Sequence, residues 1–117
     1  MLMVSRITPR QVASRMARGE RVAFVDARGE AARKSAGLRL TGAVPVGLGS
    51  LVQDATRVPA NCLVVCYGDS ESDLDVPRVA DGLRGLGFGE VRVLAGGFSA
   101  WLELRYPVQD ADGAIAA

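Results

Sequence analysis

Apolar residues follow two alternating patterns along the chain, short unbroken runs and longer stretches with helical spacing. The runs VAFV at 22–25 and LVVCY at 63–67 are continuous, as in strands that are buried on both faces. Thr8 and Pro9 form a helix start, a hydroxyl cap followed by proline, and Gly19 ends that helix. The patterns predict strands at 21–26, 42–46, 63–67 and 90–94, and helices at 9–18, 30–36, 51–55, 76–86 and 98–104.

The predicted strands and helices alternate and are joined by loops of a few residues. This alternation predicts an α/β fold, in which a mostly parallel sheet is covered by helices on both faces. We expect the most apolar strand, 63–67, to lie in the centre of the sheet. Ligands of such sheets bind beyond the carboxyl ends of the strands, so the loop 68–75 is the first candidate for a functional site.

The composition predicts one globular domain. The 117 residues are 49% hydrophobic, which is enough for a core and excludes disorder over most of the chain. The longest uncharged stretch, 40–53, is too short and too rich in glycine to cross a bilayer. Residues 1–10 contain no long apolar stretch, so we expect no secretory signal and a cytoplasmic location. We expect the domain to span 1–108 and the small, acidic residues 109–117 to form a disordered tail.

The chain has no histidine and only two cysteines, Cys62 and Cys66. Without histidine, Ser-His and Cys-His catalytic arrangements are excluded, and a zinc site lacks ligands. Two cysteines also cannot form a disulfide framework. We therefore expect no metal and no cofactor.

Charge is unevenly distributed, although the net charge is only +1. Residues 1–57 carry ten Arg or Lys and four acids, a net of +6, whereas residues 58–117 carry four and nine, a net of −5. Such runs are most often solvated surface, so we expect no nucleic-acid partner.

A distinctive motif lies near the C-terminus. Residues 94–101 read LAGGFSAW, and residues 106–108 read YPV. This segment resembles the rhodanese-like sulfurtransferase family, whose form is LxGGxxAW followed by GYPV, with Arg105 here where glycine is common.

Three further segments resemble the same family. VDAR at 25–28 matches its DxR motif, TGAV at 41–44 matches its PGA stretch with threonine for proline, and LGF at 86–88 matches the end of the helix after its active-site loop. The likeness runs from about residue 7 to residue 108. It implies a rhodanese-like three-layer fold with about five strands.

The resemblance also implies a reaction and a position for its nucleophile. The family moves sulfane sulfur from a donor such as thiosulfate to a thiophilic acceptor, through a persulfide on the first residue of the loop after the central strand. Backbone N–H groups and the helix dipole stabilise that thiolate. The family's strand end, Val-Val-x-Tyr-Cys, resembles VVCYG at 64–68, and its later Arg-Val-Ala and Gly-Phe match 78–80 and 87–88 without a gap. This alignment puts Gly68 at the position of the nucleophile. The implied loop comprises Gly68, Asp69, Ser70, Glu71, Ser72 and Asp73, with Asp26 and Arg28 in a supporting role.

Cys66 is the remaining candidate nucleophile. Residues 66 and 68 share one face of the strand, but residue 66 lies about 6–7 Å further back in the sheet. An apolar environment there raises the pKa of a thiol, so we interpret Cys66 as a small core residue. Asp26 and Arg28 are interpreted first as a structural pair.

The segment 68–75 carries four acids and no base, which opposes a bound anion. The alternate spacing of its acids resembles a calcium loop, but the required glycine and glutamate are replaced by Leu74 and Ala80. A phosphatase loop, Cys-x5-Arg, fails because Ser72 stands six residues after Cys66. We interpret the acids as complements of the helix dipole, with Asp75 or Ser72 as the cap.

Two functions follow from this sequence. The first is a noncatalytic rhodanese-like domain that acts as a binding or regulatory module. The alternative is an active sulfurtransferase that uses Cys66. The acidic loop and the Arg-rich N-terminal half further predict a basic partner surface, on another protein or on a second copy of this chain.

Overall fold

A five-stranded sheet runs through the middle of the molecule, with its strands in the order β1-β6-β5-β2-β4 and every pair parallel. The computed structural model describes residues 4–70 and 72–111. The strands of this sheet are β1 (Arg6–Ile7), β2 (Val22–Asp26), β4 (Val44–Pro45), β5 (Leu63–Tyr67) and β6 (Glu90–Leu94). The expected five-stranded parallel sheet with β5 at its centre is therefore confirmed.

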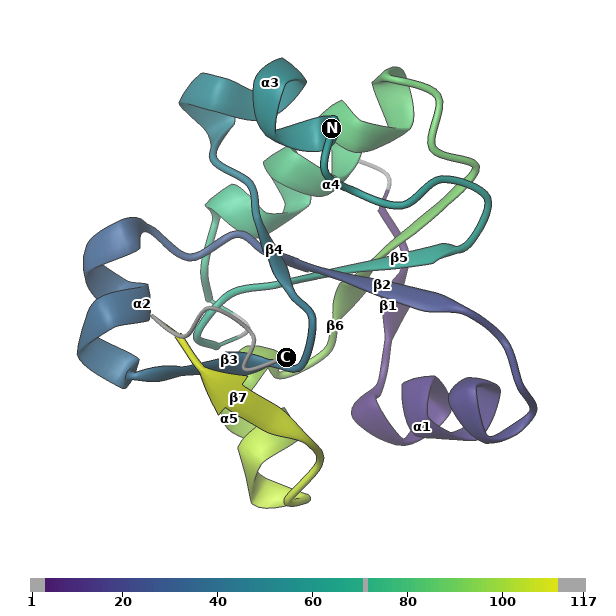
Figure 1. Cartoon of the computed structure of the whole chain (residues 1–117), viewed down its shortest axis with the longest axis vertical. Helices are drawn as coiled ribbons and strands as arrows, with labels where there is room; N and C mark the ends of the chain where they lie inside the picture. The colour runs from purple at the N-terminus through teal and green to yellow at the C-terminus, as the bar shows by residue number, and fades with distance from the viewer. Residues whose placement is uncertain (1–3, 71, 112–117) are drawn as a thin grey trace.

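Helices cover both faces of this sheet, as Figure 1 shows. They are α1 (Pro9–Ala17), α2 (Glu30–Ala36), the single 3-10 turn η1 (Leu48–Ser50), α3 (Leu51–Ala55), α4 (Asp75–Gly85) and α5 (Gly97–Glu103). One core cluster joins the sheet to α3 and α4, and a second joins the opposite face to α1 and α5. No helix in the described part of the chain is long and apolar enough to span a membrane.

Alternation along β5 divides its side chains between the two clusters. Val64 and Cys66 belong to the cluster with α3 and α4, whereas Val65 and Tyr67 belong to the cluster with α1 and α5. Since side chains alternate along a strand, Gly68 continues the face of Cys66. The predicted relation between positions 66 and 68 is confirmed.

A second, two-stranded antiparallel sheet pairs β3 (Leu38–Leu40) with β7 (Val108–Asp110). The sequence predicted neither strand, nor β1, because two or three residues give no recognisable apolar pattern. Gln109 and Asp110, expected in the tail, pair in β7, and the Ala111 N–H donates to the Gly37 carbonyl. The rest of the expected tail, 112–117, lies outside the described residues.

Candidate functional site

The loop after β5 is docked on the N-terminus of α5. The Gly68 carbonyl accepts a hydrogen bond from the Phe98 N–H at 2.8 Å, and the Asp69 carbonyl accepts from both the N–H and the hydroxyl of Ser99 at 3.0 and 2.9 Å. Gly97 has a φ of +60°, and a Cβ on it would lie 2.7 Å from the Gly68 oxygen. The close approach therefore requires glycine at 97.

Several N–H groups in and after the loop are bonded to oxygens of the loop itself. The Asp73 N–H donates to the Ser70 carbonyl, and the Ser72 N–H donates to the Ser70 hydroxyl, both at 3.4 Å. The Asp73 carboxylate accepts from the Asp75 N–H at 3.1 Å, so Asp73 caps the start of α4. The cap expected at Asp75 or Ser72 was therefore wrong. Glu71 lies outside the described residues.

The space beside Gly68 is occupied. A Cβ on Gly68 would lie 2.5 Å from Asp73 Oδ2 and 2.7 Å from Val76 Cγ2, both closer than non-bonded atoms approach. A cavity of about 20 Å³ remains, lined in part by Gly68, Ser70, Asp73 and Val76. It is large enough for one water molecule and too small for thiosulfate.

Neither cysteine lies in this loop. Cys66 is fully buried among apolar side chains of β5, α3 and α4, and burial raises the pKa of its thiol. Cys62 precedes β5 at the opposite end of the strand, where its thiol lies 3.5 Å from the Pro59 carbonyl. The interpretation of Cys66 as a core residue is confirmed by its environment.

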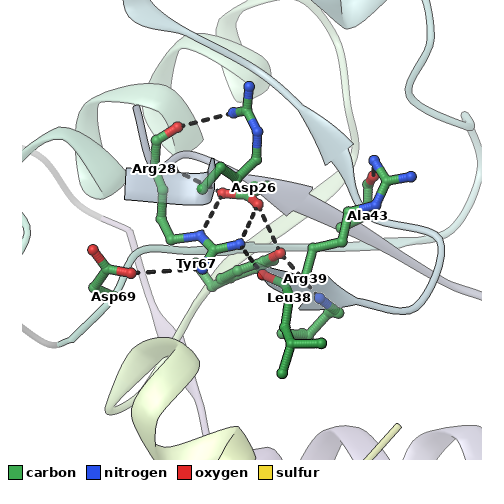
Figure 2. Close-up of polar contacts among 9 residues, drawn as sticks. Asp26, Arg28, Leu38, Arg39, Ala43, Tyr67 and Asp69 are labelled. Atoms are coloured by element: carbon green, nitrogen blue, oxygen red, sulfur yellow. Dashed lines mark hydrogen bonds and ion pairs between the residues drawn. The ribbon is translucent and has the colours of Figure 1, made fainter. Parts of the chain in front are cut away.

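Asp26 and Arg28 form a buried ion pair at the carboxyl end of β2 (Figure 2). Arg28 Nε donates to Asp26 Oδ1 at 3.1 Å and Nη2 to Oδ2 at 2.8 Å, and Nη2 also donates to the Leu38 carbonyl. The Tyr67 hydroxyl donates to Asp26 Oδ2 at 3.0 Å and accepts from the Leu40 N–H. This pair, predicted as structural, therefore ties β2, β3 and β5 together. No pattern in the sequence indicated the part that Tyr67 plays in this network.

The same arginine faces the loop after β5. Its Nη1 has no hydrogen-bond partner in the described part of the chain, and the Asp69 carboxylate lies 3.6 Å away. The Arg28 guanidinium also lies over the Phe98 ring, 4.4 Å from its centroid. Burial opposes the charge, but the hydrogen bonds and charge of Asp26 outweigh it and hold the pKa of Arg28 above its ordinary value. The Asp69 carboxylate therefore lies beside the guanidinium nitrogen that Asp26 does not bind.

The structure brings most of the predicted site residues together. Gly68, Asp69, Ser70, Ser72 and Asp73 form the loop, and Asp26 and Arg28 lie directly beside it. Within 4–70 and 72–111, no group of acids and cysteines is arranged to hold a metal ion.

The comparisons with known proteins agree with this architecture. Residues 8–104 match the family model described as the rhodanese-like domain. A comparison with curated proteins finds no match.

Solved structures resemble the fold over nearly the whole chain. A Bacillus halodurans protein is 20% identical, with a TM-score of 0.75 over 97% of this chain and 82% of that one. The rhodanese-like domain of an Anabaena protein is 23% identical, with a TM-score of 0.71 over 98% and 86%. A thiosulfate sulfurtransferase from Pseudomonas aeruginosa is 23% identical, with a TM-score of 0.74 over 92% of this chain and 20% of that one. At these identities the likeness shows the fold alone.

Proposed function

The chain belongs to the rhodanese-like domain family, and we propose that it is a noncatalytic member that acts as a binding or regulatory module. In this proposal Gly68 takes the position of the family's nucleophilic cysteine. The observation that carries it is the filled space beside Gly68, where Asp73 and Val76 leave no room for a side chain. Three N–H groups of this segment, those of Ser72, Asp73 and Asp75, are bonded to oxygens of Ser70 and Asp73 and are therefore not free to stabilise a thiolate.

The charges around the loop support the same proposal. Arg28 is the nearest buried cation, and Asp26 and Asp69 already lie against its guanidinium. An incoming thiosulfate would have to displace the Asp69 carboxylate and approach Asp73 as well. Like charges at such distances oppose binding by about 1 kcal/mol each in a solvated setting.

The alternative, sulfur transfer through Cys66, has less support. Its thiol has no exposed surface, and its raised pKa keeps it protonated at neutral pH. The thiolate is the form that attacks a sulfur donor. Transfer through Cys66 would require β5 to open before thiosulfate could reach the sulfur.

Thiosulfate-to-cyanide sulfur transfer tests the proposal. We expect the parent chain and the Cys66→Ala variant to show the same background rate, with an active rhodanese as positive control. Cys62→Ser is the matched control, because it removes the chain's other thiol and leaves Cys66 in place. Turnover by the parent that disappears in Cys66→Ala would establish the alternative and overturn the noncatalytic proposal.

A further inference from the structure

A concave surface lies between α1 and the edge of the large sheet, on the face of the sheet that α1 and α5 cover. It has a volume of about 230 Å³. One of its lining residues is Ile7 of β1, the edge strand that leads directly into α1 (Figure 1). Its polar lining consists of Gln11, Ser14, Arg15, Arg18 and Arg92. We call this surface the α1–β6 concavity.

The spacing of residues along α1 brings most of this polar lining together. Four of the side chains recur at i, i+3, i+4 and i+7 on one face of the helix and its C-cap, namely Gln11, Ser14, Arg15 and Arg18. In β6, Arg92 comes two residues after Glu90, which binds Arg15, so both side chains of β6 face α1. One helix face and one strand therefore converge on the concavity.

Two glutamates beside the concavity are already occupied by arginine. Arg15 donates to both carboxylate oxygens of Glu90, at 2.8 and 2.9 Å, and to Oε1 of Glu20 at 2.8 Å. Arg18 donates to Oε2 of Glu20 at 3.1 Å, and Nη2 of Arg92 lies 3.5 Å from Oε2 of Glu90. All four carboxylate oxygens are therefore paired, and the three guanidinium groups outnumber the two carboxylates. These contacts also orient the arginines, which lowers the entropic cost of binding a ligand.

The groups that remain unpaired around the concavity can all donate a hydrogen bond. Gln11 Oε1 accepts from the Thr8 N–H, which leaves the amide nitrogen of Gln11 as a donor. In the described part of the chain, this nitrogen and the Ser14 hydroxyl have no hydrogen-bond partner. The same is true of Nε and Nη1 of both Arg18 and Arg92. The concavity thus combines a net positive charge with donors from two elements.

We propose that the α1–β6 concavity binds the phosphoryl group of a small molecule. Such a group carries about −1.5 to −2 charges at pH 7 and three acceptor oxygens. Guanidinium groups match these oxygens in both charge and geometry. A planar carboxylate has only two oxygens and would leave more of the donors unpaired. The concavity is smaller than the pockets of about 300–1,000 Å³ that enclose larger ligands, so it admits one phosphoryl group.

Titration of the full chain with inorganic phosphate and with glycerol phosphate tests the site, at a constant ionic strength of about 0.1 M. Amide chemical shifts in NMR spectra report where each probe binds. We expect saturable shifts confined to α1 and β6, and no saturable shifts with acetate. Equal affinities for the two probes would assign the site to free phosphate, and tighter binding of glycerol phosphate would assign it to a phosphate ester.

Two substitutions remove donors of the concavity and keep the ion pairs of Arg15. Arg18→Gln and Arg92→Gln should each raise the dissociation constant about tenfold, the effect of losing one charged hydrogen bond. Arg10→Gln is the matched control, because it removes the same charge from α1 at a position outside the lining. Circular dichroism of each variant checks that the fold is kept.

Three results would overturn the proposal. The first is a set of shifts that do not saturate or that spread over the whole chain, as a general counter-ion effect produces. The second is binding that Arg10→Gln weakens as much as Arg18→Gln does. In the third, both small probes fail and a phosphoserine peptide binds, so that the ligand is another protein.

This inference goes beyond the proposed function and is independent of it. The α1–β6 concavity shares no residue with the loop after β5 or with Cys66. Sulfur transfer through Cys66 would therefore overturn the noncatalytic proposal in its own assay and leave phosphate binding unaffected. Failure of phosphate binding would likewise leave the sulfur-transfer result unchanged.

Discussion

At the scale of single residues, the site depends on one glycine and one aspartate. Gly68 is buried at the end of the central strand, and the Asp73 carboxylate lies where its side chain would begin. The same carboxylate caps α4 through the Asp75 N–H. Asp73 therefore has a structural role that does not depend on any ligand, and it competes directly with a side chain at 68.

Restoring a cysteine at position 68 measures this competition. Gly68→Cys should destabilise the fold by about 1–3 kcal/mol, because the new side chain is overpacked against Asp73 and Val76. The same substitution in an Asp73→Ala background should cost less, as thermal unfolding of the four members of the cycle would show. As the matched control, Gly68→Cys is also made in an Asp69→Ala background, because the Asp69 side chain lies against Arg28. An equal cost in all backgrounds would mean that Asp73 does not exclude a side chain at 68.

The double variant also reports on the chemistry of the loop. Removing the Asp73 carboxylate frees the Asp75 N–H at the start of α4, next to the introduced thiol. We expect the pKa of that thiol to fall below the ordinary cysteine value of about 8.5, which alkylation rates against pH measure. A thiol with an ordinary or raised pKa in a folded double variant would mean that the loop no longer forms an anion site.

At the scale of elements, the loop after β5 and α5 form one unit. The N–H groups of Phe98 and Ser99 hold the carbonyls of Gly68 and Asp69, so the helix N-terminus is bonded to the chain itself. The first N–H groups of a helix are also those that most readily bind an anion. In this protein α5 uses them to fix the loop.

Gly97 is the position where this docking is most sensitive. Gly97→Ala places a Cβ 2.7 Å from the Gly68 carbonyl and 3.0 Å from Ser70, in addition to the strain of a φ of +60°. Gly37→Ala is the matched control, because its φ is +72° and nothing lies within 4 Å of its Cβ. We expect Gly97→Ala to lose about 1–3 kcal/mol more than Gly37→Ala in urea unfolding. If Gly97→Ala and Gly37→Ala lose the same free energy of unfolding, the loop after β5 moves away from position 97 without an energetic cost.

At the scale of the whole molecule, ion pairs between elements make the stability depend on pH. Arg15 of α1 donates to both carboxylate oxygens of Glu90 in β6, at 2.8 and 2.9 Å, and to Glu20 at 2.8 Å. These hydrogen bonds lower the pKa of both glutamates from the ordinary value of 4.5. A lowered folded pKa adds stability above 4.5, and this stability is lost as the pH falls through the lowered values.

Arg15→Met isolates this contribution. At neutral pH the variant should be less stable than the parent by about 1 kcal/mol, because the pairs are partly exposed. The difference should shrink as the pH falls well below 4.5, since protonated glutamates no longer attract the guanidinium. Arg10→Met on the same helix is the matched control and should show a small difference at every pH. If the difference in free energy of unfolding between the parent and Arg15→Met stays constant down to acidic pH, the effect of the substitution comes from packing.

Sequence patterns alone determined most of the fold and part of the site. The limits of β5 and β6 follow from their apolar runs, and those of α2 and α3 agree with the predicted ranges, because local burial patterns need no knowledge of neighbours. The burial of Cys66 followed from the period of two along its strand. The short strands β1, β3 and β7 were missed because their pairing depends on partners that are distant in sequence.

Only the tertiary structure decided what surrounds the loop. That Asp73 fills the space beside Gly68, that Asp69 lies against Arg28, and that the loop carbonyls bond to α5 all depend on how separate segments meet. The sequence showed four acids in the segment 68–75 but could not show which of them lies against Arg28 and which lies beside Gly68. The apolar groove lined by Met16, Phe24 and Trp101 likewise exists only because α1, β2 and α5 pack side by side. Such contacts are set by the packing of the whole chain, and no local pattern of residues encodes them.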